Sequence, residues 1–284
     1  MADIELVTLF FEMRERPFKL LPDPELILWT RQHTAAYETL KYGLESRAPI
    51  TLLTGDIGAG KTILLRKLME EATEDLVVGL VSNVIGDKDE LLHWILNGLG
   101  VRVHSDASYV TLFQSLQDVL IEHYAAGRRV VLIFDEAQNI RNSGLEELRM
   151  LTNINSGQDE LVQLVLIGQP ELRDAIMRPE LRQFMQRVAA HYHLKPLDID
   201  DTAAYVVHLL KAGGGTGQEF RAETFSVIYH ATKGVPRLIN QLCDFAMVRA
   251  AAAEEYPIGR ETIRNILRDG VFMTCMMTLQ DDAS

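Results

Sequence analysis

The sequence predicts an α/β protein: a parallel β-sheet covered by helices on both faces, followed by a small all-helical domain. Through the first two thirds of the 284 residues, short and almost continuously apolar segments alternate with segments of helical periodicity. Continuous apolar strands are typical of parallel sheets, because helices bury both faces of such a sheet. After Lys195-Pro196-Leu197 the strand signal stops and only helical patterns remain.

The expected strands are Ile50–Thr54, Leu76–Ser82, Val130–Phe134, Leu161–Ile167 and a weaker one at Ala190–Leu194. The helices expected around them are Leu64–Glu71, Lys88–Leu99, Tyr109–Ala126 and Leu145–Ile154. The later helical patterns are Asp201–Lys211, Ala222–Thr232, Pro236–Ala253 and Arg260–Asp269. We therefore divide the chain into a linker with a first helix (1–48), an αβα core (49–196) and a helical lid domain (197–284).

Composition narrows the possible classes of protein. The net charge of −12 argues against a surface that coats nucleic acid, although a local basic stripe remains compatible with it. Cys243 and Cys275 have no metal-site spacing, so neither a disulfide framework nor a zinc site is indicated. No apolar run approaches the roughly 18 residues of a membrane span, and the acidic N-terminus is unlike a signal peptide. We expect a cytoplasmic protein, whose Met-rich segment Val271–Met277 is a packed helix end or a docking patch.

The most informative segment is Gly55-Asp56-Ile57-Gly58-Ala59-Gly60-Lys61-Thr62, which fits G-x-x-x-x-G-K-[ST] and leads into Ile63. An apolar strand precedes it and an amphipathic helix follows, which argues against a chance match in a glycine-rich turn. Glycines let backbone N–H groups point at a polyphosphate, and the helix adds the positive end of its dipole. We expect Lys61 to reach the β- and γ-phosphates and the Thr62 hydroxyl to coordinate Mg²⁺. The sequence therefore predicts a nucleoside triphosphate site for ATP.

A second acidic motif follows the strand Val130–Phe134, which ends in Asp135 and Glu136. This is the Walker B pattern, about 75 residues after the P-loop. We expect Asp135 to hold Mg²⁺ through water, because Mg²⁺ keeps several waters and takes few protein carboxylates. Glu136 is expected to polarise the water that attacks ATP. The tandem carboxylates favour hydrolysis over transfer to a second substrate.

Polar residues after the later strands complete the predicted site. Gln169, in Gly168-Gln169-Pro170, is a candidate sensor that orients water against the γ-phosphate. This role requires that its strand lie between the P-loop strand and the Walker B strand. The alternative is a plain Gln-Pro turn. Arg187 is the preferred arginine finger toward a neighbouring subunit's ATP, with Arg182 second and Arg178 also in reach. Ordinary solvated arginines are the alternative.

Arg237 stands at a predicted helix start in Gly234-Val235-Pro236-Arg237, where Pro occupies the first turn. A positive charge there has no favourable helix-dipole reason, which strengthens a functional interpretation. We expect Arg237 to fold back over the bound nucleotide and to couple the position of the helical domain to the nucleotide state.

These motifs, in this order, resemble AAA+ ATPases. The opening Pro17–Pro24 with His33, the turn Ile167–Leu172 and the segment Gly234–Asn240 further resemble the ExeA (GspA, MshM) group of bacterial secretion and pilus ATPases, which is similar to the transposition regulators TnsC and Mu B. The resemblance covers roughly residues 9 to 255. It also implies that the N-terminal segment, with Phe18 and Leu20-Leu21-Pro22, packs over the adenine, although packing within a domain explains that segment equally well.

The resemblance implies a homo-oligomer that binds ATP between subunits and transmits its nucleotide state to a protein partner. Members of the group usually continue into a transmembrane segment and a peptidoglycan-binding domain, which we do not find before Ser284. We therefore expect an ATPase of a secretion, pilus or exopolysaccharide-export system, attached to the inner membrane only through a partner. The alternative is a DNA-dependent ATPase of the TnsC or Mu B kind, for which the scattered basic residues are less suited.

Overall fold

The computed structural model describes residues 2–19, 24–82, 88–156 and 159–270, and its internal contacts form two compact units. The sheet unit comprises Arg31–Asp56 and Leu64–Leu194, and the helical unit comprises Met1–Thr30, Ile57–Ile63 and Lys195–Ser284. The Met-rich segment Val271–Met277 and Leu20-Leu21-Pro22 lie outside the described residues. Compact units do not establish domain limits, so the division at residues 48 and 196 stays a prediction.

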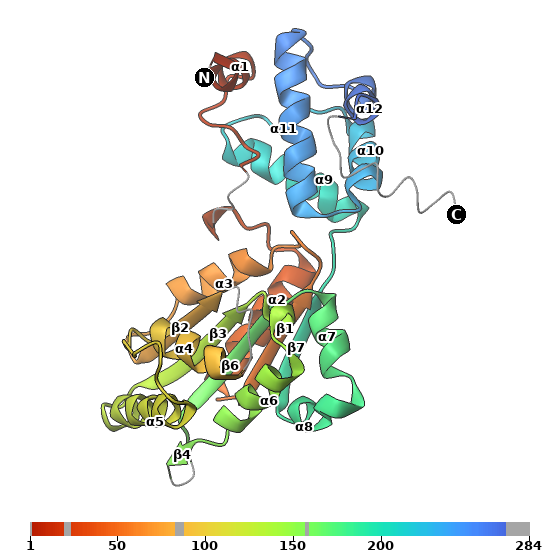
Figure 1. The fold of residues 1–284 in the computed structure, drawn as a ribbon. Helices are drawn as coiled ribbons and strands as arrows, with labels where there is room; N and C mark the ends of the chain where they lie inside the picture. Colours follow the sequence, from red (N-terminus) through yellow and green to blue (C-terminus); the bar gives the residue numbers. More distant parts are fainter. Residues whose placement is uncertain (1, 20–23, 83–87, 157–158, 271–284) are drawn as a thin grey trace. The chain divides into compact units, whose positions relative to one another are not determined.

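The sheet unit is built on a parallel sheet with the strand order β2-β3-β6-β1-β7 (Figure 1). Its strands are β1 (Ile50–Gly55), β2 (Leu76–Ser82), β3 (Arg129–Asp135), β6 (Val162–Gly168) and β7 (Val188–Leu194). The predicted strands and the parallel sheet are thus confirmed, including the weaker last strand, which begins two residues earlier than expected and forms an edge. A short hairpin that was not predicted pairs β4 (Asn155–Ser156) with β5 (Asp159–Glu160).

The strand order confirms that β6 lies between the P-loop strand β1 and the Walker B strand β3. The register aligns the carboxyl ends of these strands, because Thr54 pairs with Gly168 and Phe134 pairs with Leu166. Residues that follow β1, β3 and β6 therefore meet at one edge of the sheet, which we call the carboxyl edge.

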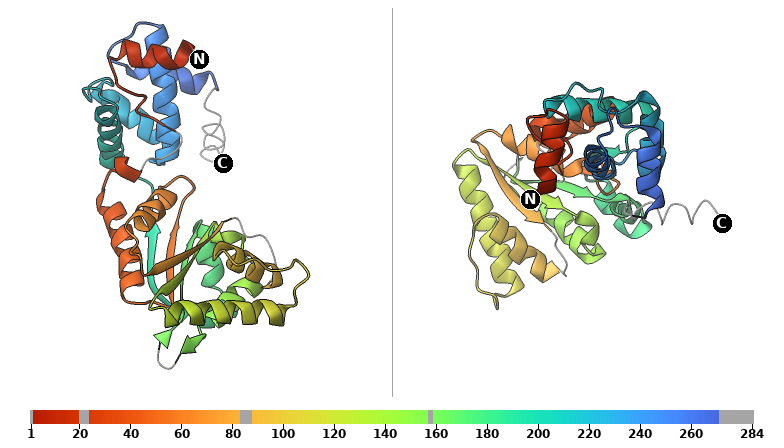
Figure 2. Two further views of the ribbon diagram at one scale, coloured as in Figure 1. Left: turned by 90° about the vertical axis from the view of Figure 1, so that its left-hand side faces the viewer. Right: turned by 90° about the horizontal axis from the view of Figure 1, so that it is seen from above.

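Helices cover both faces of this sheet, as the apolar strands predicted, and Figure 2 shows these layers from two further directions. One face packs against apolar side chains of α4 (Lys88–Gly98), α5 (Tyr109–Ala125), α6 (Asn142–Leu151), α7 (Pro170–Ile176) and α8 (Arg182–Met185). The other face meets α2 (Arg31–Glu45), where a Cβ on Gly43 would stand 2.0 Å from Thr51 Oγ1. Only glycine allows this close approach of helix and strand.

The helical unit packs α9 (Ile199–Ala212), α10 (Ala222–Thr232), α11 (Pro236–Ala252) and α12 (Arg260–Arg268) around an apolar core. The predicted helices of this region are confirmed to within two residues at each end. The N-terminal helix α1 (Ala2–Phe10) packs on α11, and the segment after it is tied down by an ion pair between Arg16 and Asp244. The Asn240 amide also donates to the Lys19 carbonyl at 3.1 Å.

Phe18 belongs to the same core, where it is 2% exposed and meets the ring of Phe220 edge to face at 6.3 Å. Its burial is explained by packing within the helical unit. The remaining short elements are α3 (Lys61–Glu70) and the 3₁₀ turns Pro24–Leu26, Ala137–Asn139 and Pro179–Leu181. None of the described helices is both long and apolar enough to cross a membrane.

Candidate nucleotide-binding and catalytic site

The carboxyl edge of the sheet is where the predicted site residues that follow β1, β3 and β6 gather. Gly55 ends β1, Asp135 ends β3, and Gln169 follows β6 as the N-cap residue of α7. A Cβ on Gly55 would lie 2.3 Å from the Leu194 carbonyl oxygen, so only glycine lets β1 leave the sheet beside β7. Parallel sheets commonly bind ligands at this edge, because loops leave the core there. Asp56 follows at the same edge, as the last residue of this segment of the sheet unit.

The rest of the P-loop, Ile57–Ile63, has its contacts mainly within the helical unit. Gly58 and Gly60 have φ angles of 80° and 105°, which favour glycine, so the loop has the backbone freedom its pattern predicts. Ala59 is buried, and Lys61 opens α3 with only 7% of its surface exposed. Thr62 is the second residue of that helix, where its hydroxyl lies at the positive end of the helix dipole.

Arg237 lies beside the P-loop within the helical unit. Its backbone N–H donates to the Gly58 carbonyl at 3.4 Å, and a Cβ on Gly58 would approach the Arg237 Cβ to 2.8 Å. The Arg237 side chain is exposed at the first turn of α11. The start of α11, including Val235, therefore packs directly on the P-loop at Gly58, and the action of Arg237 on phosphate stays a prediction.

Glu136 has the most unusual backbone of this edge, with φ 56° and ψ 39°. This left-handed conformation is uncommon for a residue other than glycine, and in this chain Arg47 and Lys233 are among the others that adopt it. The Glu136 N–H donates to Asp135 Oδ1 at 3.0 Å, which offsets part of the cost. The strain lies at the residue that the Walker B pattern singled out.

Two amide side chains converge on the Glu136 carboxylate. Gln138 Nε2 donates to Oε2 at 2.5 Å, and Gln169 Nε2 donates to the same oxygen at 3.0 Å. Gln138 Oε1 also accepts the backbone N–H of Gln169 at 3.0 Å. Sequence reasoning identified Gln169 but missed Gln138, because only the side-by-side placement of β3 and β6 brings the two together. The available signal was a polar residue two positions after Glu136.

The arginines proposed as fingers lie elsewhere in the sheet unit. Arg187 precedes β7 and pairs with Glu160 at 3.3 Å, and it also contacts Asn153. Its strand neighbour Val188 pairs with Ile50, so Arg187 lies at the amino end of the sheet. Burial raises the pKa of Glu160, while the Arg187 charge works in the opposite direction. Arg178 and Arg182 are exposed on either side of the 3₁₀ turn Pro179–Leu181.

A parallel sheet in this strand order, covered by helices and carrying a glycine-dependent P-loop and tandem carboxylates, has the fold of AAA+ P-loop NTPases. The comparison with protein families agrees, because a model described as an AAA domain matches residues 44–176. Within that class the chain is related to the General secretion pathway protein A of Aeromonas hydrophila, with 36% identity over 253 residues. The match covers 89% of this chain and 46% of the relative, so the chain spans about half of that protein's length. The resemblance to the ExeA group is confirmed.

Solved structures share the fold at low sequence identity. The Aeropyrum pernix ORC2 protein in its ADPNP and ADP complexes has a TM-score of 0.65 and 17% identity, over 88% of this chain and 70% of that chain. Cdc6p from Pyrobaculum aerophilum has a TM-score of 0.67 and 17% identity, over 87% and 71% of the two chains. The Aeropyrum pernix ORC1 protein in complex with DNA has a TM-score of 0.61 and 20% identity, over 89% and 69%. These likenesses establish the fold alone.

Proposed function

We propose that this protein binds ATP with Mg²⁺ and hydrolyses it to ADP and phosphate. The observation that carries the proposal is the Glu136 carboxylate, set on a left-handed backbone and held by two amides at the edge where β1 leads into the P-loop. A carboxylate placed in this way is suited to polarising water, the step that hydrolysis requires. The nucleotide complexes named for the structurally similar ORC2 protein support ATP as the ligand class.

The P-loop residues have distinct roles in this proposal. Backbone N–H groups of Gly55, Asp56, Ile57, Gly58, Ala59, Gly60, Lys61, Thr62 and Ile63 would cradle the phosphates. The Lys61 ammonium would neutralise charge on the β- and γ-phosphates, and Arg237 would add a second positive charge. Gln169 would orient water through its amide.

The residues present fit a magnesium ion whose binding depends on the nucleotide. A Thr62 hydroxyl and an Asp135 carboxylate are hard oxygen donors, which Mg²⁺ prefers. Within the described residues there is no cluster of three or more His, Cys, Asp or Glu side chains that could hold a metal by itself. The ion would therefore bind together with the phosphates and would neutralise charge that develops during hydrolysis.

We also propose that the protein forms a homo-oligomer in which a neighbour's arginine completes each site. Arg187 is the preferred finger, and it would first have to release Glu160 and Asn153. Arg182 and Arg178, which are exposed, are the alternatives. Replacing each arginine by alanine and mixing it with a Glu136→Gln protomer would identify the finger, because only a trans residue can be complemented between subunits.

The similarity to the General secretion pathway protein A supports a role in secretion or a related pilus or export assembly, with a cytoplasmic ATPase coupling its nucleotide state to a protein partner. The alternative is a DNA-dependent ATPase. It is favoured by 28% identity over 116 residues to a putative ORC1-type DNA replication protein of Thermoplasma acidophilum, covering 41% of this chain and 33% of that protein. The net charge of −12 favours the first proposal.

The test of hydrolysis compares the unmodified protein with Glu136→Gln and Lys61→Ala. We expect Glu136→Gln to bind ATP normally and to lose about 10²–10⁴-fold in kcat, because the water loses its base. Lys61→Ala is expected to lose ATP binding itself. Phosphate release and equilibrium binding of a fluorescent ATP analogue measure the two effects. Normal hydrolysis by Glu136→Gln would show that the catalytic carboxylate is assigned wrongly.

The two proposed processes are separated by measuring ATPase rate and oligomer size with and without duplex DNA at two salt concentrations. A DNA-dependent enzyme would be stimulated strongly, and the stimulation would fall steeply with salt because counterions are released on binding. We expect no such stimulation. Salt-sensitive stimulation with filament formation would overturn the secretion proposal in favour of the alternative.

A further inference from the structure

Gln138 occupies a position that no motif assigned, in the 3₁₀ turn Ala137–Asn139 directly after the Walker B carboxylates. Both ends of its amide are engaged. Nε2 donates to Glu136 Oε2 at 2.5 Å, and Oε1 accepts from the Gln169 backbone N–H at 3.0 Å. The chemistry of these partners fixes the orientation of the amide, because a flipped group would face a carboxylate with its carbonyl and an N–H with its NH₂.

The Gln138 amide therefore bridges the ends of two strands. One partner belongs to the turn after β3, and the other is the residue that caps α7 after β6. Gly168 makes room for this bridge, since a Cβ there would lie 3.0 Å from Gln138 Oε1 and 2.7 Å from Leu172 Cδ2. The backbone of Gly168 and Gln169 thus provides both the space and the N–H donor for the Gln138 side chain.

Both glutamine amides donate to the same carboxylate oxygen of Glu136, although they come from different strand ends. Hydrogen bonds to a charged acceptor are stronger and more directional than neutral ones. Two donors from different directions restrict rotation of the carboxylate more than one donor can. The second donor, Gln169, is itself held in place through its backbone by Gln138.

We propose that Gln138 is a positioning residue for ATP hydrolysis, which fixes Glu136 directly and Gln169 through its backbone. The inference rests on the proposed function and adds to it a residue that acts through the catalytic carboxylate. Gln138 has no role in holding the nucleotide in this proposal, so its loss should lower kcat and leave the KM for ATP unchanged.

The test uses Gln138→Met, which keeps side-chain length without polar groups, and Gln138→Glu, which keeps an acceptor for Gln169 but cannot donate to Glu136 when ionised. We expect each variant to lower kcat by about 10–100-fold, because displacement of a catalytic group by about 1 Å can cost this much. The KM for ATP and the binding of a fluorescent ATP analogue should stay within about twofold of the values for the unmodified protein. A merely structural defect would not lower kcat selectively in this way.

Gln163→Met is the matched control, because Gln163 is another glutamine of the sheet unit, buried where Gln138 is half-buried, and its amide donates to the Gly43 and Ala48 carbonyls. We expect its kcat to match that of the unmodified protein at a temperature where both are folded. The inference is overturned if either Gln138 variant, folded by circular dichroism, keeps full kcat, if KM changes instead of kcat, or if Gln163→Met loses as much kcat as Gln138→Met.

The Glu136→Gln variant separates this inference from the proposed function. If the unmodified protein does not hydrolyse ATP, the proposed function fails, whatever Gln138 does. If Glu136→Gln hydrolyses ATP normally, the catalytic carboxylate is assigned wrongly, and the positioning role of Gln138 falls with it. If Glu136→Gln is inactive while both Gln138 variants retain full kcat, hydrolysis by Glu136 stands and only the positioning role is overturned. If Gln138→Met does not fold, Gln138→Glu decides the outcome alone, since it preserves the size and one hydrogen bond of the side chain.

Discussion

The two edges of the same parallel sheet use glutamine side chains for opposite purposes. At the carboxyl edge, Gln138 and Gln169 donate to the Glu136 carboxylate. At the amino edge, the Gln163 amide donates to the Gly43 carbonyl at 3.2 Å and the Ala48 carbonyl at 3.4 Å. The first edge holds a charged group in place, and the second satisfies backbone groups that the fold has buried.

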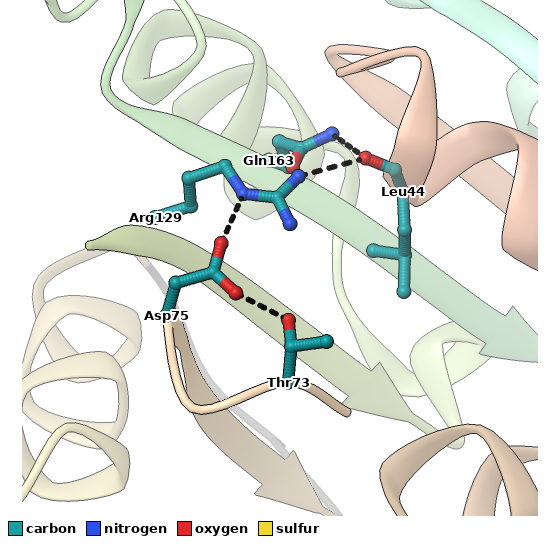
Figure 3. A network of polar contacts seen from close by, with 5 residues as sticks. All are labelled: Leu44, Thr73, Asp75, Arg129 and Gln163. Carbon is teal, nitrogen blue, oxygen red and sulfur yellow. Dashed lines mark hydrogen bonds and ion pairs between the residues drawn. The ribbon is translucent and has the colours of Figure 1, made fainter. Parts of the chain in front are cut away.

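Arg129, also at the amino edge, has the same structural role as Gln163. Figure 3 shows Arg129 between the Asp75 carboxylate, at 3.2 Å, and the Leu44 carbonyl, at 3.3 Å, with Gln163 beside it. A hydrogen bond from Thr73, with Arg129 acting in the same direction, keeps the pKa of Asp75 below its usual range. These contacts join the end of α2 to the starts of β2 and β3.

A cavity of about 170 Å³ also lies at the amino edge, lined in part by Arg47, Tyr124, Arg128 and Asp159. Two of its lining side chains are directed at a third, since Asp159 contacts Arg47 at 3.6 Å and accepts a hydrogen bond from the Tyr124 hydroxyl at 2.7 Å. The comparison teaches that the glutamine amides at one edge are directed at the Glu136 carboxylate, and those at the other edge at backbone carbonyls. Changes at the carboxyl edge should therefore alter turnover, and changes at the amino edge should alter stability.

Among the changes that test this difference between the two edges, we expect Gly168→Ala to have the largest effect, a loss of kcat. The new methyl group would crowd Gln138 Oε1 and Leu172, so the amide bridge to Gln169 would have to shift. We expect kcat to fall by about 10-fold or more, for the same reason that a misplaced catalytic group costs rate. Steady-state ATPase measurements test this.

Gly79→Ala is the control for crowding alone, because a Cβ on Gly79 in β2 would meet only leucine side chains, with Leu132 Cδ2 at 2.8 Å. We expect it to destabilise the fold with little change in kcat. Equal losses of kcat in both glycine variants would break the distinction between the two regions.

We expect Gln163→Met at the amino edge to have an intermediate effect, a loss of stability that denaturant unfolding measures. The variant leaves the buried Ala48 carbonyl without its side-chain donor, whereas the Gly43 carbonyl keeps the Ala48 N–H at 2.9 Å. We expect the free energy of unfolding to fall by about 1–2 kcal/mol, near the lower end for a buried group that loses its partner. A stability equal to that of the unmodified protein would contradict a structural role for this edge.

The smallest effect concerns pH and His123, near the end of α5. Burial, and then the nearby Arg128 charge, lowers the pKa of His123, while Glu122 acts weakly in the opposite direction. The unfolded chain therefore takes up a proton at a higher pH than the folded chain does, and stability falls as pH drops below the ordinary histidine value of about 6.5.

We expect His123→Gln to reduce the loss of unfolding free energy between about pH 7.5 and about pH 5.5 by a fraction of the roughly 1.4 kcal/mol that one pKa unit represents. Denaturant unfolding at both pH values, with the unmodified protein alongside, measures this. An unchanged pH dependence would show that other groups set the acid response.

Much of the sheet could be predicted because its signals are local. Continuous apolar runs such as Val130–Phe134 identify buried strands without knowledge of their neighbours, and β3 differs from this expectation by one residue at each end. The P-loop pattern predicted a backbone that needs glycine in the same way, and Gly58 and Gly60 have the positive φ angles that favour this residue. Between α7 and β7 the helical structure is short, because Pro179 opens a 3₁₀ turn that separates α7 from the four residues of α8.

The sequence by itself determined which residues are the candidates for the chemistry, since covalent spacing places Lys61 and Thr62 after a strand and a glycine-rich loop, and places Asp135 and Glu136 at a strand end. Only the tertiary structure decided that Gln138 meets Gln169 and that both meet Glu136. The physical reason is that β6 lies between β1 and β3, a pairing of distant segments that depends on how the sheet assembles and leaves no periodic signal in the chain.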